Sequence, residues 1–292
     1  MTKNIKQALN SAFRKVPIAQ EDINKFKEYL TALLNITDNK IKELEEHHKN
    51  NLRDFFNQIF AIHNFNSYLN TKNRNDLVIH NGDQDSPVGV IIETKKPDDS
   101  TEMVTLDKFN VKSLQQLLFY YLQDAVEENN FKLKHLIITD IYNWFIFDAT
   151  LFQRLFSQNK PLIKDFKDFQ EGRLPSKNRP FFYENIASKY IAQWEDELKN
   201  NCTYFNLKES ENKLQDNQDI ESDLSLIPLY KFLSPKHLLK LPFINDSNSL
   251  DKDFYNELLY IIGLEEVGDN KKLIQRLPSN NRQEGSLLEN VI

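Results

Sequence analysis

The chain contains 292 residues, with 37 lysines and arginines against 43 aspartates and glutamates, and a single cysteine, Cys202. At about 150 residues per domain, this length accommodates about two domains, each able to bury a core. One cysteine excludes a disulfide framework and a cysteine-based zinc site. The net charge argues against a protein that binds many phosphates, because such proteins are usually basic. This chain has a net charge of −6, so we do not expect tight DNA binding by this chain alone.

Glycine content and apolar runs restrict the protein class further. The six glycines form neither a GxGxxG nor a GxxxxGK[ST] motif, which excludes the usual phosphate-binding loops of Rossmann and P-loop enzymes. No apolar run approaches the roughly 20 residues needed to span a bilayer. The first residues also lack the apolar core of a signal peptide. We therefore expect a cytoplasmic protein that does not contact a membrane.

Apolar spacing predicts the following elements in chain order. Apolar residues recur three and four positions apart over residues 18–61, which predicts a helical region. The pattern then predicts three strands, one helix and two strands, at residues 65–69, 77–80, 88–94, 111–126, 135–139 and 144–147. This order is typical of an α+β fold with one central sheet and flanking helices.

In the second half of the chain, the sequence predicts the end of a first domain, then a linker and a helical connector. A helix is expected at residues 183–198, which completes a first domain at 1–208. Residues 209–223 contain six acidic residues and one lysine with few apolar side chains, which is typical of a mobile linker. Residues 224–292 are predicted to form a helical connector that is cut off before a further domain.

The main candidate catalytic residues lie in one segment, NDLVIHNGDQDSPVGVIIETKKP, at residues 75–97. Asp76 opens one predicted strand, and Glu93 and Lys95 end the next. Alternate side chains of a strand share a face, so Glu93 and Lys95 point the same way, and a hairpin would bring Asp76 to the same edge. Two carboxylates that hold Mg²⁺ and a lysine that orients water suit phosphodiester hydrolysis, and Mn²⁺ can substitute. The alternative is an ordinary strand-end ion pair.

A third acid lies on the preceding helix. At about 100° per residue, Glu45 falls in the apolar stripe formed by Ile41, Leu52, Phe56 and Ile59. A carboxylate on the core side of a helix is costly unless it is paired or faces a metal. Glu46 lies about 100° further round and is expected to face solvent. The alternative for Glu45 is a position just beyond the buried part of the stripe.

Further polar residues are candidates for the same site. Gln115 and Gln116 lie on the predicted helix at 111–126, although amides are common on any amphipathic helix. Arg173, Lys177 and Arg179, in the loop GRLPSKNRP, are candidates for phosphate contacts with DNA, with a solvated loop as the alternative.

Long segments of the chain resemble a known family. The Asp…Glu-x-Lys pattern resembles the PD-(D/E)xK nuclease superfamily, whose αβββαβ core is a mixed sheet flanked by helices. More specifically, the chain resembles the N-terminal nuclease region of type IIG restriction–modification enzymes over NDLVIHNG, SPVGVIIETKKP, MVTLDKFNVKSLQQLLFYYL, LKHLIITDIYNWFIFDA, KDFQEGRLPSKNRPFFYENIA and IPLYKFLSPKHLLKLPFINDSNSLDKDFYNELLYIIGLEE. The resemblance therefore covers most of the chain.

The resemblance implies roles for individual residues. Asp76 and Glu93 match the metal-binding acids, Lys95 the catalytic lysine, and Glu45 the helix glutamate. The helix glutamine corresponds to Gln115 or Gln116. Asn75 stands where the family usually has a proline.

The resemblance also implies a function and partners. It implies a Mg²⁺-dependent, site-specific deoxyribonuclease that cuts double-stranded DNA to leave 5′-phosphate and 3′-hydroxyl ends. In that family, methyltransferase and DNA-recognition domains follow the nuclease and use S-adenosylmethionine. This chain has no NPPY motif and no glycine loop for that cofactor, so those partners would lie in a missing C-terminal part. Two alternatives stay open, an inactive nuclease-like scaffold and a DNA-binding or regulatory module.

Overall fold

A computed structural model describes residues 2–70, 77–210, 220–242, 252–267, 273–282 and 287. The chain forms two compact units, Met1–Leu241 and Pro242–Ile292. Among the described residues, no helix is both long and apolar enough to cross a membrane.

The first unit is built on a six-stranded sheet whose spatial order follows the chain. Its strands are β1 (Leu69–Asn70), β2 (Leu77–His80), β3 (Val88–Thr94), β4 (His135–Thr139), β5 (Asn143–Asp148) and β6 (Thr203–Asn206). Neighbouring strands are antiparallel, except that β3 and β4 run parallel. Parallel strands need a crossover connection, which the helix between them supplies. The mixed sheet with flanking helices confirms the α+β prediction.

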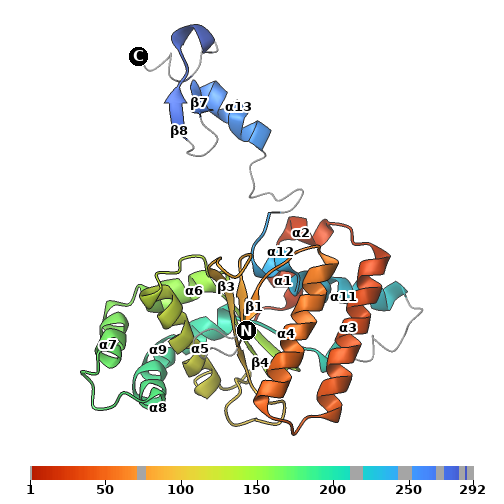
Figure 1. Cartoon of the computed structure of the whole chain (residues 1–292), viewed down its shortest axis with the longest axis vertical. Coiled ribbons are helices and arrows are strands. Elements are labelled where there is room, and N and C mark those ends of the chain that lie inside the picture. Colours follow the sequence, from red (N-terminus) through yellow and green to blue (C-terminus); the bar gives the residue numbers. More distant parts are fainter. Residues whose placement is uncertain are drawn as a thin grey trace. The chain divides into compact units, whose positions relative to one another are not determined.

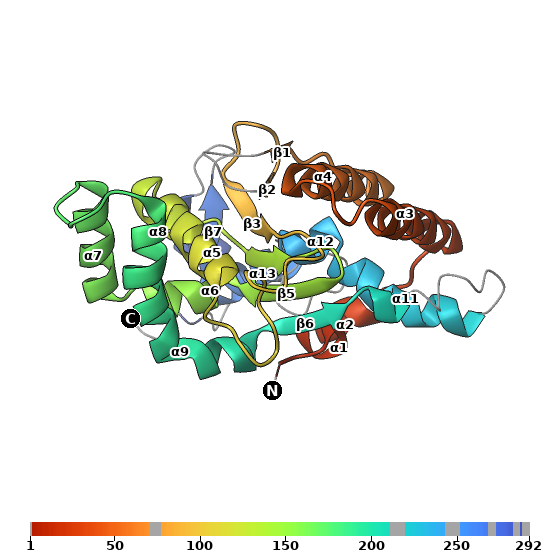
Figure 2. The same ribbon diagram turned by 90° about the horizontal axis from the view of Figure 1, so that it is seen from below.

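Helices cover both faces of this sheet. On one side lie α3 (Gln20–Asn39) and α4 (Glu45–Ile62), and on the other lie α5 (Lys112–Leu122), α7 (Lys160–Gln170), α8 (Arg179–Phe182) and α9 (Ser188–Asn201) (Figures 1 and 2). The shorter helices of the unit are α1 (Ile5–Ala8), α2 (Ser11–Lys15), α6 (Ala149–Phe152) and α12 (Pro235–Leu238). The order α4, β1, β2, β3, α5, β4, β5 is the predicted order of helix, three strands, helix and two strands.

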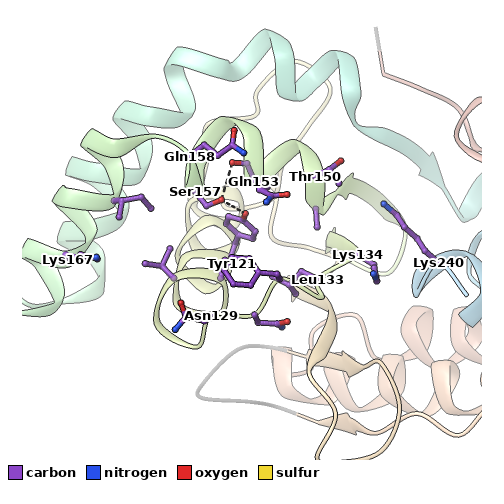
Figure 3. Close-up of a pocket in the computed structure, with 16 residues that line it drawn as sticks. Tyr121, Asn129, Leu133, Lys134, Thr150, Gln153, Ser157, Gln158, Lys167 and Lys240 are labelled. Carbon is purple, nitrogen blue, oxygen red and sulfur yellow. Dashed lines mark hydrogen bonds between the residues drawn. The ribbon is translucent and has the colours of Figure 1, made fainter. Parts of the chain in front are cut away.

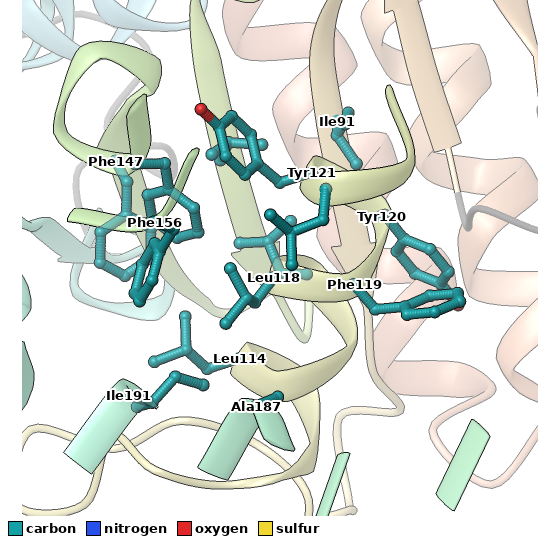
Figure 4. Close-up of a cluster of buried hydrophobic side chains, with 14 of the residues drawn as sticks. Ile91, Leu114, Leu118, Phe119, Tyr120, Tyr121, Phe147, Phe156, Ala187 and Ile191 are labelled. Atoms are coloured by element: carbon teal, nitrogen blue, oxygen red, sulfur yellow. The ribbon is translucent and has the colours of Figure 1, made fainter. Parts of the chain in front are cut away.

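The middle of the sheet is buried on both faces. Every residue of β2, β3 and β4 is buried, because helix layers cover the sheet on two sides. On the α5 side, Leu114 and Leu118 belong to one apolar cluster with Ile91 and Phe147 (Figure 4). A charged side chain in such a strand is an exception to the apolar pattern, and Glu93, at the end of β3, is one.

The N-terminal helical region differs from the prediction because it consists of two helices. Residues 40–44 form a turn between α3 and α4, so Ile41 lies outside the helix and does not extend the apolar stripe. The last turn of α3 contains Thr37, Asp38 and Asn39, which are weak helix formers that favour helix ends. Glu45 is consequently the first residue of α4 rather than a mid-helix residue.

Two other boundaries differ from the prediction. The first strand is limited to Leu69–Asn70, whereas residues 65–68 are irregular. After Leu122 the chain does not continue as an α-helix but forms a π-helical turn, η1 (Gln123–Glu127). Two similar turns occur later, η2 (Gln153–Ser157) and η3 (Tyr183–Ala187), and η3 lies between α8 and α9. The helix predicted at 183–198 therefore begins as a π-helical turn.

The first unit extends further along the chain than the predicted linker. Helix α11 (Ile220–Phe232) packs on α3, and the buried Lys231 ammonium donates hydrogen bonds to the backbone oxygens of Phe13, at 3.0 Å, and Arg14, at 2.8 Å. These contacts join α11 to the first unit. The division between units thus falls at Leu241, not at the expected boundary of residues 223 and 224, and residues 211–219 of the linker lie outside the described ones.

The second unit contains a helix and a hairpin. Helix α13 (Lys252–Ile262) is followed by the antiparallel strands β7 (Leu264–Val267) and β8 (Leu273–Arg276). Two 3₁₀ turns, Lys208–Ser210 and Ser279–Asn281, complete the described elements of the chain. The predicted helical connector therefore also contains a two-stranded sheet.

Candidate active site at the end of strand β3

Glu93 and Lys95 form a buried ion pair at the end of β3. The Lys95 Nζ lies 2.8 Å from Glu93 Oε1, and the two side chains are 3% and 0% exposed. The Lys95 N–H donates to the Thr139 carbonyl oxygen at 2.8 Å, which continues the β3–β4 pairing by one residue. Because alternate residues of a strand share a face, this pairing directs both side chains to the same side of the sheet.

Two more carboxylates surround the Lys95 ammonium. Glu45 Oε2, from the first turn of α4, lies 3.8 Å from Nζ, and Glu102 Oε2 lies 3.4 Å from it. Glu102 also pairs with Lys112, from the first turn of α5. Three carboxylates and two ammonium groups therefore meet in this cluster. Glu46, in contrast, is exposed and pairs with Lys49, as its predicted position requires.

A tight turn after β3 positions Glu102. Asp99 Oδ1 accepts hydrogen bonds from the N–H groups of Thr101 and Glu102, each at 3.1 Å, and from the Thr101 hydroxyl at 2.8 Å. Burial opposes ionisation of Asp99, but these hydrogen bonds outweigh it and, with the Lys95 charge, lower its pKa. The Glu102 carbonyl oxygen then accepts a hydrogen bond from Ser113 N, at 3.1 Å, which ties the turn to α5.

The two candidate glutamines of α5 have different surroundings. Gln115 donates through Nε2 to Asn110 Oδ1 at 3.0 Å, and Asn110 in turn donates to the Ser188 carbonyl oxygen at 2.9 Å. Gln115 thus belongs to a network that joins α5 to α9. The Gln116 Oε1, although shielded from solvent, accepts no hydrogen bond from a described residue. Gln116 follows Lys112 by four positions and so shares its face of the helix, the face next to Glu102.

Of the three predicted DNA-contact cations, Arg179 lies beside the ion-pair cluster. Its guanidinium lies 5.0 Å from the ring centroid of Phe119. Burial raises the pKa of Tyr183, and the charges of Arg179, Glu93 and Lys95 all act on the same hydroxyl. Tyr183 therefore lies between Arg179 and the Glu93–Lys95 pair, close enough for all three charges to affect its hydroxyl.

The other two cations, Arg173 and Lys177, make their contacts within their own loop and the helix before it. Arg173 lies 2.6 Å from Asp168 Oδ1 and also pairs with Glu171. Lys177 packs over Gly172, which has φ +73°, a conformation that favours glycine. No contact between the described residues joins Arg173 or Lys177 to the cluster around Lys95.

Asp76, the predicted first metal ligand, lies outside the described residues. The last described pair of the β2–β3 ladder is Leu77 with Ile92, the sequence neighbours of Asp76 and Glu93. Within the described ranges, no group of three or more His, Cys, Asp or Glu side chains is arranged to hold a metal ion. Magnesium ordinarily uses only one or two carboxylates, with water and substrate oxygens completing its shell.

Three residues of the site had not been predicted: Glu102, Lys112 and Tyr183. Each comes from a segment outside the Glu-x-Lys strand, and each reaches the site only through tertiary contacts. The sequence carried one usable signal, because Lys112 precedes Gln116 by one helical turn and therefore had to share its face.

Comparisons with known proteins give a family but no function. Residues 3–246 match the model of a family described as a domain of unknown function, DUF7149, and residues 247–292 match a second family of unknown function, DUF7814. No curated protein and no solved structure matches the chain. Since the first match covers most of the chain, the protein belongs to the DUF7149 family.

Proposed function

We propose that the first unit is a Mg²⁺-dependent DNA endonuclease domain with a PD-(D/E)xK core. The observation that carries the proposal is the fully buried Glu93 carboxylate, 2.8 Å from the Lys95 ammonium, at the end of the central strand β3. A protein interior excludes a charge unless the charge is paired or functional. The order of helix, three strands, helix and strand around this pair supports the same core.

The donor set fits a hard divalent cation. Glu93 and Asp76 would hold Mg²⁺, with Mn²⁺ as a substitute, because both ions prefer carboxylate oxygens. The partially exposed carboxylates of Glu45 and Glu102, next to Glu93, favour a cation here. When bound, the ion would act as a Lewis acid on the phosphate group.

The chain's own residues have separable roles in this proposal. The Lys95 ammonium would orient the attacking water by a hydrogen bond and stabilise negative charge at the phosphate. The Gln116 amide oxygen would accept a hydrogen bond from the same water or from the substrate. Arg179, beside the cluster, would contact a DNA phosphate, since guanidinium groups bind phosphates well.

Sequence recognition would come from elsewhere in a longer enzyme. The resemblance to type IIG restriction–modification enzymes supports methyltransferase and DNA-reading domains as partners, with S-adenosylmethionine bound there. Under this proposal the substrate is double-stranded DNA, and the present chain supplies the cleavage step.

Metal binding and cleavage test the proposal together. We would titrate Mg²⁺ and Mn²⁺ into the wild type by calorimetry and compare Glu93→Gln and Asp76→Asn, with Glu46→Gln as the matched control on an exposed acid. We expect binding that the first two changes abolish and the control leaves intact. Nicking of supercoiled DNA in Mn²⁺ should be lost in Lys95→Met. Equal heats in all variants would contradict the proposal.

One observation favours a second candidate, an inactive nuclease-like scaffold. The Lys95 ammonium already faces three carboxylates, so the cluster can serve as a structural ion-pair network by itself. A scaffold predicts that the wild type binds neither ion and does not nick DNA, while Lys95→Met still lowers stability.

A further inference from the structure

A second concave region of the first unit lies at the opposite end of β4 from Glu93 and Lys95. A cavity of about 480 Å³ opens where β4 begins, beside Leu133 and Lys134, and is floored by the buried Tyr121 (Figure 3). A second cavity of about 430 Å³ adjoins it and shares Ser157 and Lys167 with it. The two together form one elongated groove, which we call the β4 groove.

Four of the lysines that border the β4 groove form no salt bridge with a described carboxylate. Lys160, Lys164 and Lys167 line the second cavity, and their spacing of four and three residues places them on one face of α7. Lys134 lies at the other end, toward Lys240 (Figure 3). Among the described residues, Lys134, Lys160, Lys164 and Lys167 form no salt bridge.

The carboxylates that line the β4 groove are fewer than its basic side chains, and each already pairs with a cation. Asp168 and Glu171, which line the second cavity, both pair with Arg173. Asp148 lies 2.6 Å from the Lys240 ammonium. The groove is therefore locally positive, although the chain as a whole has a net charge of −6.

An exposed aromatic ring stands at the rim of the β4 groove. Phe131 lines the first cavity, yet its side chain is 77% exposed, the largest exposure among the large apolar residues described. The adjoining wall carries the polar side chains of Asn129, Gln153 and Gln158 (Figure 3). Two π-helical turns, η1 and η2, contribute lining residues, and such turns frequently occur at functional sites.

We propose that the β4 groove binds a single strand of nucleic acid. Lysines spaced along a groove contact successive phosphates, and an exposed aromatic ring stacks on a base, the combination that single-strand binding uses. Here Lys134 and Lys167 contact phosphates, Phe131 stacks on a base, and the amide side chains hydrogen-bond to base edges. This site is separate from the proposed nuclease site and does not depend on cleavage there.

Fluorescence anisotropy of the full chain with a labelled oligo-dT of about 20 nucleotides, in EDTA, tests the proposal. Each phosphate contact to a single strand contributes a slope of about 0.7 in log K against log salt, or about fivefold in affinity at 0.1 M relative to 1 M salt. We expect Lys134→Ala and Lys167→Ala each to lower the slope by about 0.7 and to weaken binding about fivefold at 0.1 M salt. Lys6→Ala, an exposed lysine of α1 outside both cavities, should bind as the wild type does.

An abasic oligonucleotide of the same length separates stacking from charge. Phe131→Ala should weaken binding to oligo-dT about tenfold but leave binding to the abasic strand unchanged. Only oligo-dT has bases on which the Phe131 ring can stack. The lysine variants should weaken both. Wild-type affinity in Lys134→Ala and Lys167→Ala, equal losses in Lys6→Ala, or equally strong competition by poly-glutamate would overturn the proposal. EDTA keeps this outcome distinct from any failure of metal-dependent cleavage.

Discussion

Replacing Lys95 by methionine tests the ion-pair cluster most directly. Methionine keeps the length of the side chain but removes the charge, which leaves the Glu93 carboxylate, 0% exposed, without the ammonium 2.8 Å away. Removing one partner of a buried ion pair costs about 3–5 kcal/mol, because the remaining charge stays buried. Glu102 and Glu45 are 28% and 36% exposed and lie further from Nζ, so their loss adds little. We expect the free energy of unfolding to fall by about 3–4 kcal/mol.

Urea unfolding, followed through the fluorescence of the buried Trp144, measures this loss as a lower midpoint at an unchanged slope. Adding Glu93→Gln to Lys95→Met should recover most of the loss, since a neutral amide then replaces the buried carboxylate that lost this ammonium. Lys25→Met is the matched control, because its ion pair with Glu21 is largely exposed and should affect stability far less. A loss below about 1 kcal/mol in Lys95→Met, or no recovery in the double variant, would refute the reasoning.

The remaining predictions concern pH and individual site residues. Burial lowers the pKa of His135 to about 4 from an ordinary value of 6.5, so the unfolded chain binds more protons between these values and stability should fall as the pH drops from 6.5 to 4. This lowering of the His135 pKa corresponds to about 3 kcal/mol, and urea unfolding across this range should show a flatter pH profile in His135→Asn. Gln116→Leu should leave the free energy of unfolding nearly unchanged but lower DNA nicking about tenfold. Gln115→Leu should cost about 1 kcal/mol and spare nicking, because of the two glutamines only Gln115 has a side-chain hydrogen bond to another described residue. Arg179→Ala should reduce nicking about tenfold and Arg173→Ala should not, and equal effects of the two changes would contradict the substrate contact proposed for Arg179.

Local patterns predicted the elements that depend on near neighbours in the chain. The strands at 77–80, 88–94 and 135–139 agree with the structure to the residue, because each is a short apolar run bounded by polar punctuation and buried on both faces. The outward position of Glu46 likewise follows from helical geometry alone. The helical region predicted at 18–61 consists of two helices, since apolar spacing continues through the turn at 40–44 while the helix does not.

The sequence by itself determined the α+β class, the strand that ends in Glu93 and Lys95, and the shared face of these two side chains, because strand periodicity is a local property. Only the tertiary structure decided which other groups meet them. Glu102 reaches Lys95 because the Asp99 turn folds the chain back, and Tyr183 lies near the Glu93–Lys95 pair because η3 packs on α5. Such contacts join residues far apart in the chain, and they depend on how whole layers pack rather than on any spacing within one segment.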